Sequence, residues 1–429
     1  MNHKFLILLI LCCALCISGV EITETTPQTL NISSRHWTPL PHKNTVGGIG
    51  IRCVVAASVS FVAAAISSAG GIGGGGLFIP ILTIIAGQDV KTASTYSAFM
   101  VTGGSIANVM RSKRLIDYDM ALVCQPSLLL GVSCGVVLNV VFPEWLITLL
   151  FVVFVAFCTF KTCRSAVVYW SLESRNGGGG EVEAGGSTKV PLLSSTTTDD
   201  VDEGKYETPW MSIGMLALIW FSFFVLYLLR GNRYGQGVIE MEACGTEYWI
   251  ISSMQIPLAV FFTSWILFRG TSASTRQENG GLIRRQSSSE LVYPIMALLA
   301  GLLGGVFGIG GGMLISPILL QLGNEPQVTA ATCSFMVLVS SSMSALQYLL
   351  LGMKHIYAAL SYAAICFVAS LVGLTVIQQA ILKHGRPSLI VFSVATVMAL
   401  SIVLMTSFGT IDIWRSYTSG QNMGFNKPC

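Results

Sequence analysis

The sequence predicts an all-α polytopic membrane protein with two homologous transmembrane helical repeats, each containing a helix broken by glycine. Three observations predict this class. Only 10% of the residues are charged, whereas 52% are hydrophobic; soluble domains carry about 25% charged residues. Apolar runs of about 20 residues, the length that spans a bilayer as a helix, recur along the chain. A glycine-rich stretch also occurs twice, beginning at Gly71 and at Gly308.

Apolar segments account for most of the chain between residues 48 and 408. Two of them, ending near residues 87 and 323, are shorter than a normal span and fit short crossings, half-helices or re-entrant pieces. The expected segments are 48–69, 71–87, 93–110, 118–142, 145–163, 209–230, 248–268, 291–307, 313–323, 329–351, 355–381 and 388–408.

The N-terminus reads as a secretory signal peptide over residues 1–20, with a short basic start, an apolar core and small residues at its end. A retained signal anchor is the alternative. Residues 21–47 are polar and carry the sequon Asn31-Ile32-Ser33, so we expect an extracytosolic segment glycosylated at Asn31. These features predict a multi-pass integral membrane protein of the secretory or endomembrane system or the plasma membrane.

Polar stretches divide the rest of the chain. We expect transmembrane repeat 1 at 48–170, connecting transmembrane helices at 209–268, transmembrane repeat 2 at 291–410 and a polar C-terminal tail at 411–429. Residues 171–208 are acidic and rich in Gly, Ser and Thr, which predicts a disordered linker. Residues 269–290 form a basic polar loop. Ser287 follows two arginines there, as in a phosphorylation site, although the arginines also fit a positive-inside anchor.

A fixed offset of 237 residues relates the two repeats. From Gly71 to Ser97 it gives 13 identities in 27 positions without a gap, including Pro80-Ile81-Leu82 with Pro317-Ile318-Leu319. Such duplications are typical of secondary transporters. If the segment 71–87 crosses the membrane, seven crossings separate the repeat starts and the repeats are inverted. If it is re-entrant, the repeats run parallel.

The glycine stretches predict local helix breaks, because glycine costs a helix about 1 kcal/mol per residue relative to alanine. A break at membrane depth needs protein or a water-filled cavity around it. It leaves free N–H groups where the next helix begins, near Leu77 and Leu314, and helix N-termini favour anions. The alternative is that the glycines serve only close helix packing.

Hydroxyl groups follow each glycine stretch where the next helix is expected to begin, and they fit N-caps or donors to an oxyanion. Together the two repeats predict one site for a small tetrahedral or pyramidal anion. Its candidate residues are Gly73, Gly74, Gly75, Gly76, Thr92, Thr95, Ser97, Gly310, Gly311, Gly312, Thr329, Thr332 and Ser334.

Other classes of function lack their signatures. A net charge of +3 without a basic stripe argues against a nucleic-acid partner. The five histidines are dispersed, and no metalloprotease, serine-hydrolase or phosphate-loop motif is present, which argues against an enzyme with a metal or cofactor. No charged residue lies in the middle of an apolar segment, so neutral dipoles should hold the substrate. The lipid bilayer and a small inorganic or organic anion are the expected partners, and the sequence is compatible with a homo-oligomer.

The paired Gly-Ile-Gly-Gly-Gly stretches, each followed by Pro-Ile-Leu and then Thr-Ala-x-Thr-x-Ser, resemble the TauE/SafE family of sulfite or organosulfonate exporters. The signal peptide, the polar linker and the C-terminal Met423–Cys429 look like its plant branch. The resemblance covers roughly residues 48–410 and implies an exporter of sulfite or a related sulfur oxyanion. A different interpretation is a non-transporting membrane sensor or scaffold, regulated through the cytosolic linker.

Overall fold

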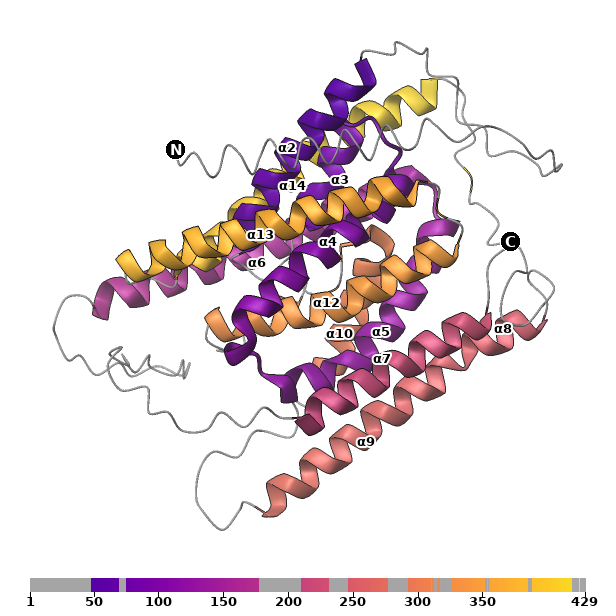
Figure 1. The fold of residues 1–429 in the computed structure, drawn as a ribbon, viewed down its shortest axis with the longest axis vertical. Coiled ribbons are helices and arrows are strands. Elements are labelled where there is room, and N and C mark those ends of the chain that lie inside the picture. Colours follow the sequence, from indigo (N-terminus) through magenta and orange to yellow (C-terminus); the bar gives the residue numbers. More distant parts are fainter. Residues whose placement is uncertain are drawn as a thin grey trace.

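The protein is a bundle of helices, shown in Figure 1. The computed structural model describes residues 48–68, 75–176, 210–230, 246–276, 292–309, 311, 315, 316, 319, 326–351, 353, 355–384, 388–418 and 424. In chain order its helices are α2 (Gly48–Ser68), α3 (Gly75–Ile84), α4 (Val90–Ser112), the short 3-10 helix η1 (Lys113–Leu115), α5 (Tyr118–Val141), α6 (Glu144–Asn176), α7 (Trp210–Arg230), α8 (Thr246–Ser253), α9 (Gln255–Arg276), α10 (Val292–Phe307), α12 (Pro326–Leu350), α13 (Ile356–His384) and α14 (Ser388–Thr418).

The predicted class, an all-α polytopic membrane protein, is confirmed. Within the described residues, six helical spans are long and apolar enough to cross a membrane. Five belong to α5, α6, α7, α12 and α13, and the sixth, Trp249–Phe268, runs from α8 into α9. α5 matches the segment expected at 118–142. Helices α6, α9 and α14 run past the expected ends of their apolar segments, to Asn176, Arg276 and Thr418. Polar residues can continue a helix outside the apolar layer, because the backbone bonds are local.

The two repeats exchange partners. At the offset of 237, α2 corresponds to α10, α4 to α12, α5 to α13 and α6 to α14. In the structure α10 packs against α5, and its counterpart α2 packs against α13. The helices α4 and α12 pack against each other, as do α6 and α14. Helices of each repeat therefore pack against helices of the other repeat, as a pseudo-two-fold arrangement requires.

Two glycine contacts show this correspondence in detail. A Cβ added at Gly135 of α5 would lie 2.1 Å from the carbonyl oxygen of Leu302 in α10. A Cβ added at Gly373 of α13 would lie 2.0 Å from the carbonyl oxygen of Ala65 in α2. Ala65 and Leu302 are equivalent positions, and Gly373 is one residue from the equivalent of Gly135. Small residues thus allow close backbone contact where the repeats exchange helices.

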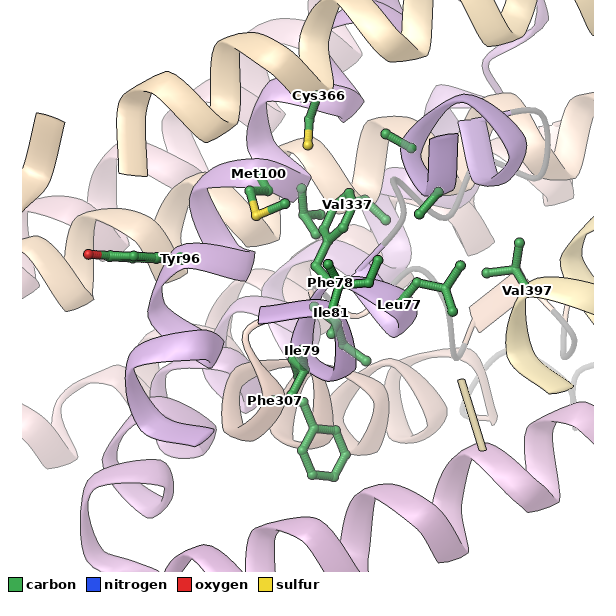
Figure 2. Close-up of a cluster of buried hydrophobic side chains, with 14 of the residues drawn as sticks. Leu77, Phe78, Ile79, Ile81, Tyr96, Met100, Phe307, Val337, Cys366 and Val397 are labelled. Atoms are coloured by element: carbon green, nitrogen blue, oxygen red, sulfur yellow. The ribbon is translucent and has the colours of Figure 1, made fainter. Parts of the chain in front are cut away.

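The short helix α3 lies at the centre of the hydrophobic core. Figure 2 shows its residues Leu77, Phe78, Ile79 and Ile81 surrounded by helices of both repeats. Every residue from Gly75 to Leu82 is buried. The surrounding side chains that Figure 2 labels are Tyr96, Met100, Phe307, Val337, Cys366 and Val397. A helix buried on all sides by protein, with no lipid-facing side, can contain a proline and begin with glycine without exposing backbone to lipid.

The connecting helices α7 and α9 both pack against α5, and α7 also packs against α12 (Figure 1). Phe223 and Phe262 are buried in one hydrophobic cluster with Leu122 and Leu129 of α5. The Trp220 indole N–H donates a hydrogen bond of 3.2 Å to the Ser342 hydroxyl of α12. These helices are therefore attached to one side of the repeat core.

Candidate functional site

The first glycine stretch separates α2, which ends at Ser68, from α3, which begins at Gly75. The candidates Gly73 and Gly74 fall between them, outside the described residues. The end of α2 is fastened by Asn108 of α4. Its Nδ2 donates to the carbonyl of Ser68 at 3.2 Å, and its Oδ1 accepts from the Ser68 hydroxyl at 2.6 Å. The same hydroxyl lies 3.1 Å from the carbonyl of Ser370 in α13.

The second glycine stretch begins with a well-defined helix stop. Gly308 has a φ of +63°, which an L side chain rarely adopts. The N–H of Gly308 bonds to the carbonyl of Gly305, and the N–H of Ile309 bonds to that of Gly304. This pair of bonds is the Schellman motif, which ends many helices at a left-handed glycine. The glycine thus breaks α10, as the sequence predicts.

Polar side chains from two further helices satisfy the end of α10. Asn139 of α5 donates to the carbonyl of Val306 at 2.6 Å, and the Tyr348 hydroxyl of α12 donates to the carbonyl of Gly305 at 3.1 Å. All of these groups are buried. The sequence interpretation did not include Asn108, Asn139 or Tyr348. An asparagine inside an apolar segment was the available signal, because a buried amide needs a partner.

The two glycine stretches meet in space. A Cβ added at Gly75 would lie 2.7 Å from the Cβ of Ile309, and one added at Gly308 would lie 2.0 Å from the carbonyl oxygen of Ser94. One added at Gly311 would lie 2.3 Å from Cδ1 of Leu128. Each glycine therefore allows a contact that a side chain would prevent. The candidates Gly310 and Gly312 lie outside the described residues.

The first turn of α3 faces this meeting point with unused donors. Gly75 and Gly76 open the helix and both are buried. The first N–H groups of any α-helix lack an acceptor within the helix. Within the described chain, the N–H groups of Gly75, Gly76 and Leu77 have no hydrogen-bond acceptor. N–H donors at the N-terminus of a helix, the positive end of the helix dipole, favour the binding of an anion.

The hydroxyl groups of the first repeat divide into two kinds. The N-cap of α4 is Asp89, whose side chain accepts from the N–H and the hydroxyl of Thr92. Thr95 donates to the carbonyl of Lys91 in its own helix at 3.0 Å. The Ser97 hydroxyl is buried and has no hydrogen-bond partner among the described groups. Ser97 lies one turn after Ser94, the residue that contacts Gly308. Of these candidates it alone keeps its hydroxyl unused.

The hydroxyls of the second repeat divide in the same way. Ser334 donates to the carbonyl of Ala330 at 2.8 Å, and Thr332 accepts from the N–H of Asp117 at 2.9 Å. The hydroxyl of Thr329 is buried without a partner in the described part of the chain. Whether a hydroxyl finds a partner depends on its rotamer and on the neighbouring helices. The sequence therefore predicted the cluster of hydroxyls but not which of them lack a partner among the described groups.

The buried polar residues of the described chain are uncharged. They are serines, threonines, asparagines and glutamines. No group of three or more His, Cys, Asp or Glu among the described residues could hold a metal ion. The predicted modification sites Asn31 and Ser287 lie outside the described residues, as do the signal peptide and most of the linker.

Apolar spanning helices and a core built from both halves of the chain define a multi-pass integral membrane protein. The family model described as Sulfite exporter TauE/SafE matches residues 56–216 and again 209–405, once for each half of the chain. This chain belongs to that family.

Several curated relatives come from Arabidopsis thaliana. Sulfite exporter TauE/SafE family protein 5 is 50% identical over 100% of both chains. Family protein 2 is 54% identical over 88% of this chain and 87% of its own length. Family protein 1 is 51% identical over 95% and 94%, respectively. No solved structure matches this chain.

Proposed function

We propose that this protein exports a small anion, sulfite or a related sulfur oxyanion or organosulfonate, and binds it where the two glycine stretches meet. The contact between Gly75 and Ile309 carries this proposal, because it joins the broken helices of both repeats at one place. A binding site at a repeat interface can face either side of the membrane when the repeats rock against each other.

The unused donors support an anion as the ligand. The N–H groups at the start of α3 and the buried hydroxyl of Ser97 can donate hydrogen bonds, and no carboxylate among the described residues accepts them. Burying a polar group without a partner costs about 1–3 kcal/mol. A bound oxyanion, with several acceptor oxygens, would remove this cost.

The names of the relatives support the substrate class, since they are called sulfite exporters. The close-packing alternative explains Gly135 and Gly373, whose neighbours are backbone atoms of helices. It does not explain the N–H groups at the beginning of α3, which have no acceptor among the described residues. We therefore favour binding for the glycine stretches and packing for the glycines elsewhere.

Transport into proteoliposomes tests the proposal. The purified full-length chain is reconstituted, and uptake of labelled sulfite, sulfate and a sulfonate is compared with that of empty vesicles. We expect uptake of at least one of them that saturates with concentration. Competition among the three anions then ranks them. Uptake that never exceeds the empty-vesicle background for any of the three would contradict the substrate class.

A further inference from the structure

Pro80 leaves one carbonyl of α3 without its helical partner. In an α-helix the carbonyl of residue 76 accepts from the N–H of residue 80. Proline has no N–H, and Pro80 lies inside α3, so this bond cannot form. The carbonyl of Gly76 is therefore orphaned by the sequence itself. Because Gly76 is buried, water does not replace the missing donor, and leaving the carbonyl unpaired would be costly.

Ser401 of α14 supplies the missing donor. Its hydroxyl donates a hydrogen bond to the carbonyl of Gly76, across a sequence separation of 325 residues. Ser401 is fully buried, and α14 packs against α3 along this contact. The last helix of the second repeat thus completes the first turn of a helix that belongs to the first repeat.

This bond also fixes an N–H group. The carbonyl of Gly76 and the N–H of Leu77 belong to one planar peptide group, so the direction of one sets the direction of the other. Gly76 has no Cβ, and its backbone could rotate this peptide with little steric resistance. A hydrogen bond to the carbonyl also polarises the N–H and strengthens its donation to an acceptor.

We propose that Ser401 is a positioning residue of the anion site, which holds the Gly76–Leu77 peptide so that the Leu77 N–H points out of the α3 N-terminus toward the bound anion. The inference rests on the proposed function, because it concerns the same site. Pro80 makes Ser401 necessary by removing the helical donor to the same carbonyl.

Four variants test the inference in the full-length protein in proteoliposomes, with whichever labelled anion the wild type transports best. Ser401→Ala should raise the KM about tenfold and leave the maximal rate within about twofold. Ser401→Thr, which keeps the hydroxyl, should stay close to the wild type. Pro80→Ala restores an N–H at residue 80, so the double variant Ser401→Ala/Pro80→Ala should recover most of the loss. Ser60→Ala, which removes another buried hydroxyl, serves as the control and should leave the KM unchanged.

A second readout does not depend on transport. Hydrogen–deuterium exchange of the peptide that spans Gly75–Ile84 should be about tenfold faster in Ser401→Ala and should slow again in the double variant. If the wild type transports no anion, the proposed function and the positioning role of Ser401 are both wrong, whatever the rate of hydrogen–deuterium exchange. If the wild type transports and Ser401→Ala changes neither KM nor exchange, the inference alone is wrong. A rise in KM that Pro80→Ala fails to reverse would also overturn it.

Discussion

Gly75 of α3 lies so close to Ile309 that a Cβ added at Gly75 would sit 2.7 Å from the Cβ of Ile309 and 2.9 Å from its carbonyl oxygen. The two residues come from the glycine stretches of different repeats. Real Cβ contacts are almost never this short, so the backbones approach each other only because residue 75 has no side chain. This contact leads to a direct prediction.

Replacing Gly75 by alanine should separate the two glycine stretches. The added methyl group meets backbone atoms of Ile309, which cannot turn away as a flexible side chain could. Overpacking of this kind costs about 1–3 kcal/mol. We expect a lower thermal unfolding midpoint in detergent and a loss of anion uptake. Gly214→Ala in α7 is the matched control, because nothing lies within 4 Å of its added Cβ, and an unfolding midpoint lowered equally by both variants would contradict the explanation.

Gly308 should tolerate alanine less well than Gly311. At Gly308 the positive φ costs an alanine about 1–2 kcal/mol, and its methyl group would meet the carbonyl oxygen of Ser94. At Gly311 the nearest atom is the end of the Leu128 side chain, which can rotate. We expect Gly308→Ala to lower the yield of folded protein more than Gly311→Ala, measured by size-exclusion chromatography after membrane extraction. The reverse order would show that the left-handed turn does not matter.

The apolar pattern predicted most of the fold. The segment expected at 118–142 is α5 at Tyr118–Val141. An uninterrupted apolar run of spanning length forms a helix in a membrane, because a helix satisfies all of its backbone hydrogen bonds internally. The glycine break in the second repeat was also predictable, since only glycine readily adopts the φ of residue 308. The long polar ends of α6 and α14 were not, because the chain outside the apolar layer gives no hydrophobic signal.

Much less of the site could be predicted. The sequence placed Thr92 and Ser97 in one hydroxyl cluster, but Thr92 bonds to Asp89 and Ser97 has no partner among the described groups. That difference depends on rotamers. The bond from Ser401 to Gly76 joins residues 325 positions apart, and only the packing of α14 against α3 creates it. Contacts between distant helices leave no periodic pattern in a single sequence.

The Tyr348 hydroxyl should contribute to stability through the end of α10. Tyr348→Phe keeps the ring and removes the donor to the carbonyl of Gly305, which stays buried. The N–H of Gly308 still bonds to this carbonyl, so the variant loses one of two hydrogen bonds, a net loss of about 0.5–1.5 kcal/mol. We expect a lower thermal unfolding midpoint for this variant. The control is Tyr357→Phe, whose ring is 62% exposed and whose midpoint should stay at the wild-type value. Equal midpoints for the two variants would rule out a role for the cap.

Two serines of α4 separate an anion-binding role from a structural one. Ser94 donates to the carbonyl of Val90 at 2.8 Å in its own helix, whereas the hydroxyl of Ser97 is buried with no partner in the described structure. If an anion accepts from Ser97, Ser97→Ala should raise the KM for uptake about three- to tenfold, as expected for one lost hydrogen bond of about 0.5–1.5 kcal/mol. Its unfolding midpoint without substrate should not fall, because removing an unsatisfied buried hydroxyl relieves a cost. Ser94→Ala should leave the KM at the wild-type value. An unchanged KM in both variants would remove Ser97 from the proposed site and leave the N–H groups of α3 as its remaining donors in the first repeat.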